Sequence, residues 1–216
     1  MRNFTFSKFH PVETSVIGSR DFNGVVHPVL QFQPFDYAVT RGFLLFRGNL
    51  QGTNKEYQGK KLVGYSADQM FDVVADVEKY QSFLPFCKRS HVTFRSKSNI
   101  KADLIIGFPP LVESYTSEVT LIKPQLIKAV CTEGKLFHYL LTIWKFSPGL
   151  KNNENTCIID FYVSFNFKSA LHSHLANLFF NELVRQMESA FYQEAQVRYG
   201  KPVVKMQTLN VLQKNS

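Results

Sequence analysis

The sequence contains few of the features that mark disulfide-bonded, zinc-binding or membrane-spanning proteins. Its three cysteines, Cys87, Cys131 and Cys157, are far apart, odd in number and without a CxxC pair. They argue against a disulfide framework or a zinc site and favour buried thiols in a reducing compartment. No uninterrupted apolar run approaches the ~20 residues of a membrane-spanning helix, so any membrane contact is expected to be peripheral.

The motifs of common catalytic sites are missing as well. The sequence has neither a GxSxG motif nor a glycine-rich phosphate loop, and no cysteine stands in a recognisable catalytic setting. His172 and His174 are two residues apart in a helical segment, so they point in different directions and make a poor metal pair. His138 alternates within a strand and is expected to be an ordinary sheet residue. We therefore expect a non-enzymatic protein with no catalytic residue, no metal and no cofactor.

Positive charge is present but scattered. The chain has 25 lysine and arginine residues against 17 aspartate and glutamate residues, a net charge of +8, yet no block of lysine or arginine exceeds two in a row. No nucleic acid is therefore expected as a partner. A solubilising excess spread over the surface is the simplest interpretation, followed by weak attraction to anionic lipid.

Phenylalanine is abundant, with 21 residues against one tryptophan. A phenyl ring offers apolar area with no polar group to satisfy, so it suits a core or a greasy cavity equally. The run from Ala102 to Phe146 contains about five strand-like segments that are apolar on one face and often on both. Such a sheet must be covered twice by protein or must hold an apolar ligand.

The order of predicted elements indicates an α+β fold. An edge strand over 56–65 precedes a helix that Ser66 and Gln69 begin with a capping box, and a short second helix follows. About six antiparallel strands then lead to a helix over 169–199, about 45 Å long. We expect a curved antiparallel sheet of about six to seven strands wrapped around this long C-terminal helix, with a cavity between them.

Both ends of the chain are expected to lie outside this fold. Residues 1–54 show no sustained periodicity and meet the composition of a mitochondrial presequence only in part, although Arg41-Gly42-Phe43 has the look of a processing site. We interpret 1–54 as an N-terminal arm, either a targeting segment or an extension without function. The folded domain is placed at 55–200, and 201–216 is expected to be a loose C-terminal tail.

An ordered set of motifs within residues 56–200 is specific as a whole, although each member is weak. The set comprises Gly64-Tyr65-Ser66, Met70-Phe71-Asp72-Val73-Val74, Tyr80, Phe83-Leu84-Pro85-Phe86-Cys87-Lys88, Ile106-Gly107-Phe108-Pro109-Pro110, Glu113-Ser114-Tyr115-Thr116-Ser117, Lys128-Ala129-Val130-Cys131-Thr132, Gly134-Lys135-Leu136-Phe137, Thr142-Ile143-Trp144-Lys145-Phe146-Ser147-Pro148-Gly149, Leu171-His172-Ser173 and Phe179-Phe180. Together these segments resemble the START-like, polyketide-cyclase-type helix-grip superfamily, and within it the mitochondrial coenzyme Q-binding family. Phe86 stands where that family usually has tryptophan and Leu141 where glutamate is expected, and both changes make the chain more apolar.

The resemblance implies a non-catalytic carrier or chaperone that binds ubiquinone and supports its use in respiration and its biosynthesis. It implies a location on the matrix side of the inner mitochondrial membrane, bound peripherally. The domain at 55–200 would then be a START-like lipid-binding domain and the arm at 1–54 a mitochondrial targeting segment. Expected partners are ubiquinone, the membrane surface, and respiratory or coenzyme Q biosynthesis complexes.

The candidate lining of the cavity consists of large apolar residues from the strands and the long helix: Phe108, Leu111, Tyr115, Leu140, Trp144, Phe161, Phe179, Leu183 and Met187. Each alone is more typical of an ordinary core, but a core rarely needs so many large rings. Burying an isoprenoid tail among them would contribute about 25 cal/mol per Å² of apolar surface.

Polar contacts to a quinone head and a route to the membrane can also be predicted. Tyr115 and Lys88 are candidate donors to the head, with Glu113 holding Lys88, although Lys88 and Glu113 fit an ordinary surface pair better. Apolar residues in two loops, Leu84-Pro85-Phe86 and Pro109-Pro110, form the candidate portal that contacts the bilayer.

Two other functions stay open at this point. An aromatase/cyclase-type enzyme acting on a hydrophobic ring compound would need a buried pair of catalytic groups in the cavity. A ribosome-interacting protein would need a contiguous basic face, which the scattered lysines do not predict.

Overall fold

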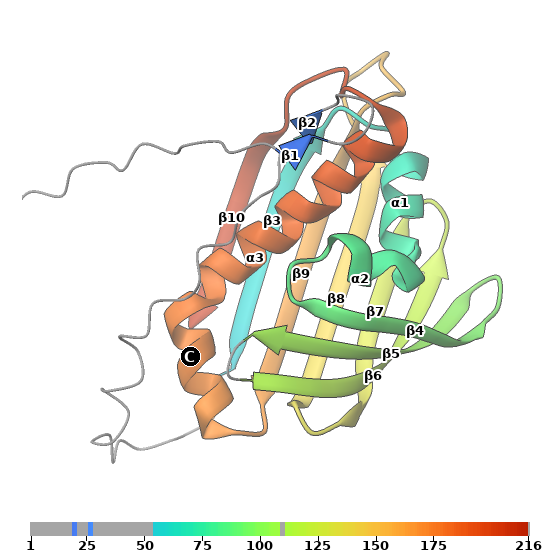
Figure 1. Ribbon diagram of the computed structural model, residues 1–216. Helices are drawn as coiled ribbons and strands as arrows, with labels where there is room; N and C mark the ends of the chain where they lie inside the picture. The colour runs from blue at the N-terminus through green and yellow to red at the C-terminus, as the bar shows by residue number, and fades with distance from the viewer. Residues whose placement is uncertain (1–18, 21–25, 28–53, 109–110, 216) are drawn as a thin grey trace, which may run out of the picture. The chain divides into compact units, whose positions relative to one another are not determined.

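One large antiparallel sheet with helices over its inner face forms the main part of the protein (Figure 1). In the computed structural model, the described residues are 19–20, 26–27, 54–108 and 111–215, with side chains described for 54–107, 112–169, 182–210 and 212. Strand order across the sheet is β10-β3-β9-β8-β7-β6-β5-β4. The elements are β3 (Lys55–Val63), α1 (Ala67–Ala75), the short 3-10 helix η2 (Val77–Lys79), α2 (Tyr80–Phe83), β4 (Cys87–Arg95), β5 (Asn99–Phe108), β6 (Leu111–Ile122), β7 (Leu126–Gly134), β8 (Phe137–Pro148), β9 (Cys157–Phe167), α3 (Ala170–Tyr199) and β10 (Gln207–Asn215).

The chain divides into two compact units, residues 1–48 and 49–216. In the first unit, two short strands are described, β1 (Ser19–Arg20) and β2 (Val26–His27), which pair with each other in antiparallel fashion. The rest of the predicted arm up to residue 53, including Arg41-Gly42-Phe43, lies outside the described residues.

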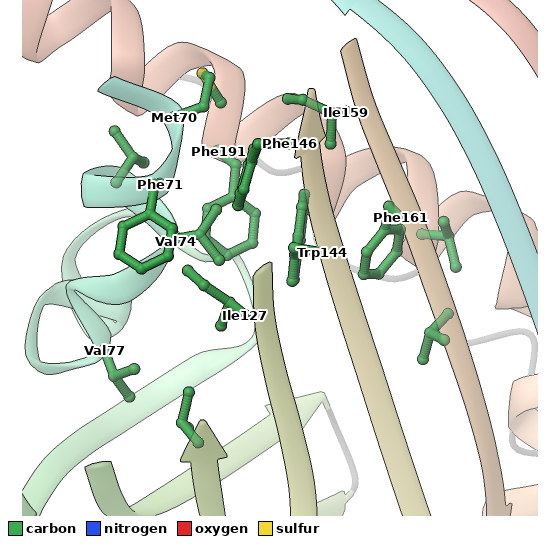
Figure 2. Packing of buried hydrophobic residues seen from close by; sticks show 14 of the residues in the cluster. Met70, Phe71, Val74, Val77, Ile127, Trp144, Phe146, Ile159, Phe161 and Phe191 are labelled. Carbon is green, nitrogen blue, oxygen red and sulfur yellow. The ribbon is translucent and has the colours of Figure 1, made fainter. Parts of the chain in front are cut away.

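Helix α1 begins where the sequence predicts. The Ser66 hydroxyl accepts a hydrogen bond from the Gln69 backbone N–H at 3.2 Å, and the Gln69 side chain accepts one from the Ser66 N–H at 2.9 Å. This reciprocal pair satisfies two of the free N–H groups at the start of the helix, so the predicted capping box is confirmed. The buried stripe of α1 packs on the sheet, where the rings of Phe71 and Phe146 lie 6.0 Å apart (Figure 2).

The long C-terminal helix is also confirmed. It ends at Gly200, whose φ of +79° is a conformation that favours glycine, so the chain leaves the helix there. Val184, Glu188, Phe191 and Ala195 are buried and lie three or four residues apart, on the stripe of α3 that faces the sheet. In Figure 1, α3 runs obliquely in front of the sheet on the side of β3 and β9.

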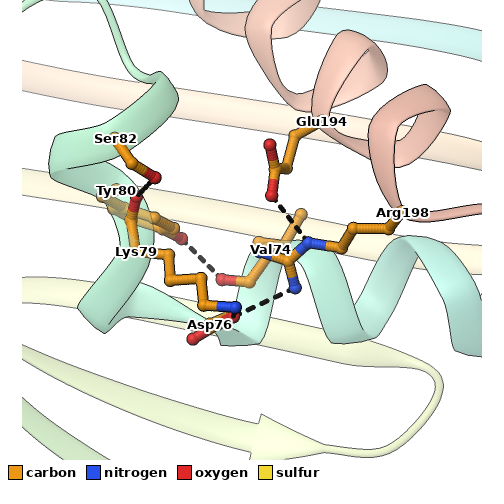
Figure 3. Close-up of polar contacts among 7 residues, drawn as sticks. All are labelled: Val74, Asp76, Lys79, Tyr80, Ser82, Glu194 and Arg198. Carbon is orange, nitrogen blue, oxygen red and sulfur yellow. Dashed lines mark hydrogen bonds and ion pairs between the residues drawn. The ribbon is translucent and has the colours of Figure 1, made fainter. Parts of the chain in front are cut away.

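Polar contacts join the end of α3 to the turn between α1 and α2 (Figure 3). Arg198 lies 3.0 Å from the carboxylate of Asp76 and donates a hydrogen bond to Glu194 at 2.8 Å. Tyr80 donates its hydroxyl hydrogen to the Val74 carbonyl in the same region. The two short helices are therefore fastened to the last turns of α3, and the three helices cover the sheet as one layer.

The core lies between this layer and the sheet. Every second residue of β9 is buried, namely Ile159, Phe161, Val163, Phe165 and Phe167. The predicted period of two is therefore confirmed, and it turns these side chains toward α3. The predicted α+β helix-grip architecture is confirmed as well.

The loose tail expected after residue 200 is wrong. Residues Gln207–Asn215 form β10, which pairs with β3 from Gln207 opposite Leu62 to Asn215 opposite Lys55. Among the described residues the large sheet therefore has eight strands, and β3, expected at the edge, is an inner strand. The physical reason is that β10 pairs with the backbone N–H and C=O groups on the open edge of β3. The leucines Leu209 and Leu212 of β10 are exposed, so the strand has no alternation of buried and exposed residues from which the sequence could predict it.

Candidate ligand-binding site

Aromatic rings fill the space between the sheet and the second half of α3. Trp144 of β8 lies at the centre, with its ring centroid 4.2 Å from Phe161 and 4.9 Å from Phe191 of α3. Tyr80 and Phe83 of α2 each lie 5.4 Å from the ring of Phe191 as well. Figure 2 shows Phe191 pointing from α3 toward Trp144. These distances are typical of packed aromatic pairs, so this part of the predicted cavity is closed by side chains.

A second aromatic group lies where β8 begins and β9 ends. The ring of Phe137 is 5.4 Å from that of Tyr115 and 4.9 Å from that of Phe167. Burial, and after it the neighbouring thiols of Cys87 and Cys131, raise the pKa of Tyr115, so its hydroxyl stays protonated. Within the described part of the chain this hydroxyl has no hydrogen-bond partner, and it remains a candidate donor to a ligand.

Free space remains beside the first aromatic group, in a cleft between β3, α1 and α3. The free space in it is only about 20 Å³, enough for about one water molecule. Small-molecule sites start at about 300 Å³, far more than this free space, so a ligand with a long tail requires α3 and the sheet to move apart. The lining residues are Lys61, Val63, Met70, Trp144, Ile159, Glu188, Phe191, Tyr192 and Met206.

One wall of the cleft carries a buried polar cluster, formed by Glu188 of α3 with Tyr57 and Lys61 of β3. The Lys61 ammonium lies 2.7 Å from the Glu188 carboxylate, and the Tyr57 hydroxyl donates to the same oxygen at 3.0 Å. Tyr57 and Glu188 are only 4% and 7% exposed. Gly59 leaves room for this arrangement, because a Cβ atom there would collide with the Tyr57 ring.

Burial governs the protonation of the groups on the inner face of β3. It raises the pKa of the Tyr57 phenol, and the nearby Glu188 carboxylate raises it further, so Tyr57 remains a hydrogen-bond donor. Burial lowers the pKa of Lys55, which is 7% exposed near the start of the same strand. The inner face of β3 is thus the polar side of an otherwise apolar interior.

The predicted lining residues fall into three groups. Trp144 lines the cleft, and Phe161, 1% exposed, packs behind it against Tyr57 at 6.1 Å. Tyr115 belongs to the second aromatic group, and half-buried Leu140 and Met187 pack against the core, while Leu183 is half-buried on α3. The side chains of Phe108, Leu111 and Phe179 lie outside the described residues.

The first predicted portal loop lies beside the end of β5. The carbonyl of Phe86 accepts a hydrogen bond from the Gly107 N–H at 2.9 Å, which fastens the loop after α2 to the end of β5. Leu84, Pro85 and Phe86 are half-buried, and Leu84 packs against the core. Pro109 and Pro110 lie outside the described residues.

The expected contact between Lys88 and Glu113 is wrong. Lys88 lies over Gly107, where a Cβ atom would meet it at 2.9 Å, on the same side as exposed Val112. Glu113 pairs with Ile106, one position along the strand, so its side chain points to the opposite face. Lys88 therefore lies on the outer face of the sheet, away from Tyr115.

The polar cluster was not predicted, although the sequence holds a signal for it. Glu188 falls on the buried stripe of α3, four residues after Val184 and three before Phe191. Lys61 alternates inward with Val63. A charged residue at such positions indicates a buried partner, but Lys61 and Glu188 are 127 residues apart, and only the fold shows that they meet.

The cysteines are free, as expected, with Cys87 and Cys157 buried and Cys131 half-buried. Burial raises the pKa of Cys87 to about 11 and that of Cys157 to about 12. In the part of the chain that the structure describes, no group of three or more metal-ligating side chains occurs. The helices of that same part include none that is both long and apolar enough to cross a membrane.

A curved antiparallel sheet that grips a long C-terminal helix over an aromatic interior defines a START-like helix-grip protein. The family model described as polyketide cyclase / dehydrase and lipid transport matches residues 63–192. The chain therefore belongs to this family and groups within it with the mitochondrial coenzyme Q-binding proteins.

Known relatives support the assignment to this family and to the coenzyme Q-binding proteins within it. The chain is 48% identical over 175 residues to the mitochondrial coenzyme Q-binding protein COQ10 of Drosophila melanogaster, which covers 81% of this chain and 72% of that protein. It is 30% identical over 146 residues to the ribosome association toxin RatA of Vibrio cholerae, covering 68% of this chain and 99% of the toxin. The ZhuI aromatase/cyclase from Streptomyces sp. R1128 has a similar fold, with a TM-score of 0.58 and 14% identity over 69% of this chain and 99% of that one.

Proposed function

We propose that the protein binds ubiquinone in the grip between the sheet and α3 and acts as a non-enzymatic carrier or chaperone. The observation that supports this most directly is the 48% identity to a coenzyme Q-binding protein over 81% of the chain. The geometry agrees with it, because the inner face offers aromatic rings around Trp144 and Phe137 and a polar cluster at one wall. A quinone with an isoprenoid tail needs both kinds of surface.

The tail accounts for most of the binding energy in this proposal. Each buried methylene contributes about 0.8 kcal/mol, so an apolar interior binds a tail without specific contacts. Aromatic rings fill the interior of the protein, so α3 must separate from the sheet before a tail can enter. Part of the binding free energy of the tail offsets the cost of this separation. The ligand then replaces contacts that the closed protein makes with itself.

The proposed setting is the matrix side of the inner mitochondrial membrane, where the protein would serve respiratory complexes or the enzymes of coenzyme Q biosynthesis. The mitochondrial name of the Drosophila relative supports the organelle. The loop at Leu84-Pro85-Phe86, together with Pro109-Pro110, is proposed as the portal to the bilayer. Apolar loop residues beside the end of β5 fit a surface that meets lipid.

Extraction of the purified protein with organic solvent, followed by mass spectrometry, tests the proposed ligand. Protein taken from cells rich in ubiquinone should release it in proportion to protein. Release of phospholipid alone under those conditions would overturn the proposal.

Uptake of ubiquinone from liposomes tests the portal. The Phe86→Asp variant should take up quinone more slowly, because it places a charge at the proposed lipid contact. Phe94→Asp is the matched control, since Phe94 is 57% exposed on β4 and lies outside the two loops. Equal uptake by Phe86→Asp, Phe94→Asp and the wild type would refute the portal.

An enzyme is the second candidate function, because Lys61 and Glu188 form the buried polar pair that such an activity needs. Incubation with ubiquinone and with its ring precursors, followed by mass spectrometry, separates the two. Unchanged compounds support a carrier, and a new product supports an enzyme. For the ribosome-binding alternative, the described Lys101 pairs with Glu133 at 3.4 Å and therefore does not add to a basic face.

A further inference from the structure

The cluster of Tyr57, Lys61 and Glu188 stands out because of where it lies. Lys61 and Glu188 both line the cleft, and their side chains are only 15% and 6% exposed. Most of the other lining residues are apolar, including Trp144 and Phe191. The opposite charges of Lys61 and Glu188 thus border the free space at one wall of an otherwise apolar cleft.

Stability alone does not explain this cluster. Removing a carboxylate and an ammonium from water costs several kcal/mol for each ion, and the attraction between them often no more than offsets that cost. Apolar residues of similar size at the positions of Tyr57, Lys61 and Glu188 would hold α3 against β3 as well or better. A charge pair kept at the wall of a cleft is better explained by a ligand that needs it.

The hydrogen bonds of the cluster leave donors available. An ammonium group has three N–H donors. The Lys61 ammonium uses one of them on Glu188, and this group makes no other hydrogen bond to the residues that the structure describes. Lys61 and Tyr57 both donate to the same oxygen of Glu188, so the charge of this carboxylate is paired, while the Lys61 ammonium keeps spare donors for the cleft.

A quinone head matches this surface. Its carbonyl and methoxy oxygens are acceptors only, and its flat ring suits contact with the indole of Trp144 and the phenyl ring of Phe191, which line the same cleft. Donors on a lysine that a carboxylate holds in place, beside aromatic rings, form a site for an acceptor-rich ring.

We propose that Lys61 binds the quinone head group by donating hydrogen bonds to its oxygens, while Glu188 and Tyr57 hold the lysine in position. The head then lies between β3 and α3, and the tail extends along the inner face toward Phe137. This inference rests on the proposed function and adds the place and the chemistry of head recognition.

The test compares two ligands, a short-tail ubiquinone and a polyisoprenoid alcohol with the same number of isoprene units but no ring. Trp144 is the one tryptophan in the sequence and lines the cleft, so quenching of its fluorescence reports quinone binding. The alcohol is measured by competition with the quinone. The decisive variant carries Tyr57→Phe, Lys61→Met and Glu188→Leu together, since apolar replacement of a whole buried cluster usually preserves folding.

The wild type should prefer the quinone. The triple variant should bind it about tenfold to a hundredfold more weakly, as expected for the loss of hydrogen bonds from a charged donor, and should bind the alcohol as the wild type does. Lys60→Met is the matched control, because Lys60 is exposed on the opposite face of β3. It should leave both affinities unchanged.

Each outcome decides a different question. A folded triple variant that keeps the preference for the quinone would overturn the head site but not the lipid-binding function. A wild type that binds neither ligand would overturn the proposed function and this inference with it. If the triple variant does not fold, the double variant Lys61→Met/Glu188→Leu replaces it, since it removes both charges together and keeps Tyr57, and an unchanged preference in that variant has the same meaning as in the triple variant.

Discussion

Replacing Phe191 by alanine should cost the folded protein about 3–5 kcal/mol of unfolding free energy, as for other buried aromatic residues. Phe191 is 3% exposed and contacts the rings of Trp144, Tyr80 and Phe83. Burial of a phenylalanine contributes about 1.5–3 kcal/mol. A remaining cavity of about 100 Å³ adds about 2.4 kcal/mol at ~24 cal/mol per Å³, and partial relaxation of the neighbours reduces the total.

Urea unfolding followed by the fluorescence of Trp144 measures this loss. The midpoint should fall while the dependence on urea stays the same, because the surface exposed on unfolding hardly changes. Val197→Ala is the control on the same helix, since Val197 is 81% exposed and its removal should change stability by less than about 0.5 kcal/mol. A loss below about 1 kcal/mol for Phe191→Ala would show that α3 is not anchored through this ring.

The same substitution tests whether the closed interior opens for a ligand. The vacated space adjoins the cleft, so a short-tail ubiquinone should stabilise Phe191→Ala at least as much as the wild type. At a free ligand concentration of 100 times the Kd, the gain is about 2.7 kcal/mol. A clearly smaller gain for Phe191→Ala than for the wild type at the same quinone concentration would contradict an opening of the interior beside Phe191.

Three further predictions concern other parts of the fold. Ser66→Ala removes half of the capping box and should lower the unfolding free energy by about 1 kcal/mol in urea, and an unchanged midpoint would show that the cap contributes nothing. Arg198→Met leaves the carboxylates of Asp76 and Glu194 without their shared partner and should lower the unfolding free energy by about 1–3 kcal/mol in urea; an unchanged midpoint would contradict a role for this contact in holding α3 to the short helices. The raised pKa of Cys87, about 11, keeps its thiol protonated, so iodoacetamide should label it far more slowly at neutral pH in the folded than in the unfolded chain. The stability that this thiol contributes is complete below about pH 8.5, where the unfolded thiol titrates, and is lost as the pH rises toward 11; equal labelling rates in the folded and unfolded chain would refute its burial.

Features that depend on neighbours in the sequence could be predicted, and those that depend on distant partners could not. The cap at Ser66 and the end of α3 at Gly200 follow from contacts within a few residues. The alternation in β9 follows from burial of one face. In contrast, β10 is specified by the open edge of β3, which lies about 150 residues earlier in the chain.

In the candidate site, too, the inward-facing residues could be predicted from the sequence, but their partners could not. Trp144 and Phe161 could be predicted as interior residues because their strands alternate, but no pattern shows that their rings pack together and close the space between them. Tyr57, Lys61 and Glu188 could be predicted as inward-facing, but not as partners. A buried charge becomes interpretable only when the group opposite it is known, and for Lys61 that group lies on α3.

The apolar run from Ala102 to Phe146 acquires a different meaning in the folded chain. On the outer face of the sheet, Val130 lies opposite Leu141 and Ile143 opposite Tyr162, and all four are half-buried. Cross-strand neighbours at this spacing shield one another, and the long stems of exposed Lys128 and Lys145 add cover, so the outer face needs neither a second protein layer nor a ligand. Apolar residues on both faces therefore do not by themselves indicate a lipid. What separates the inner face from the outer one is the charge pair of Lys61 and Glu188 beside Trp144, because a surface made only to be covered by α3 has no need of it.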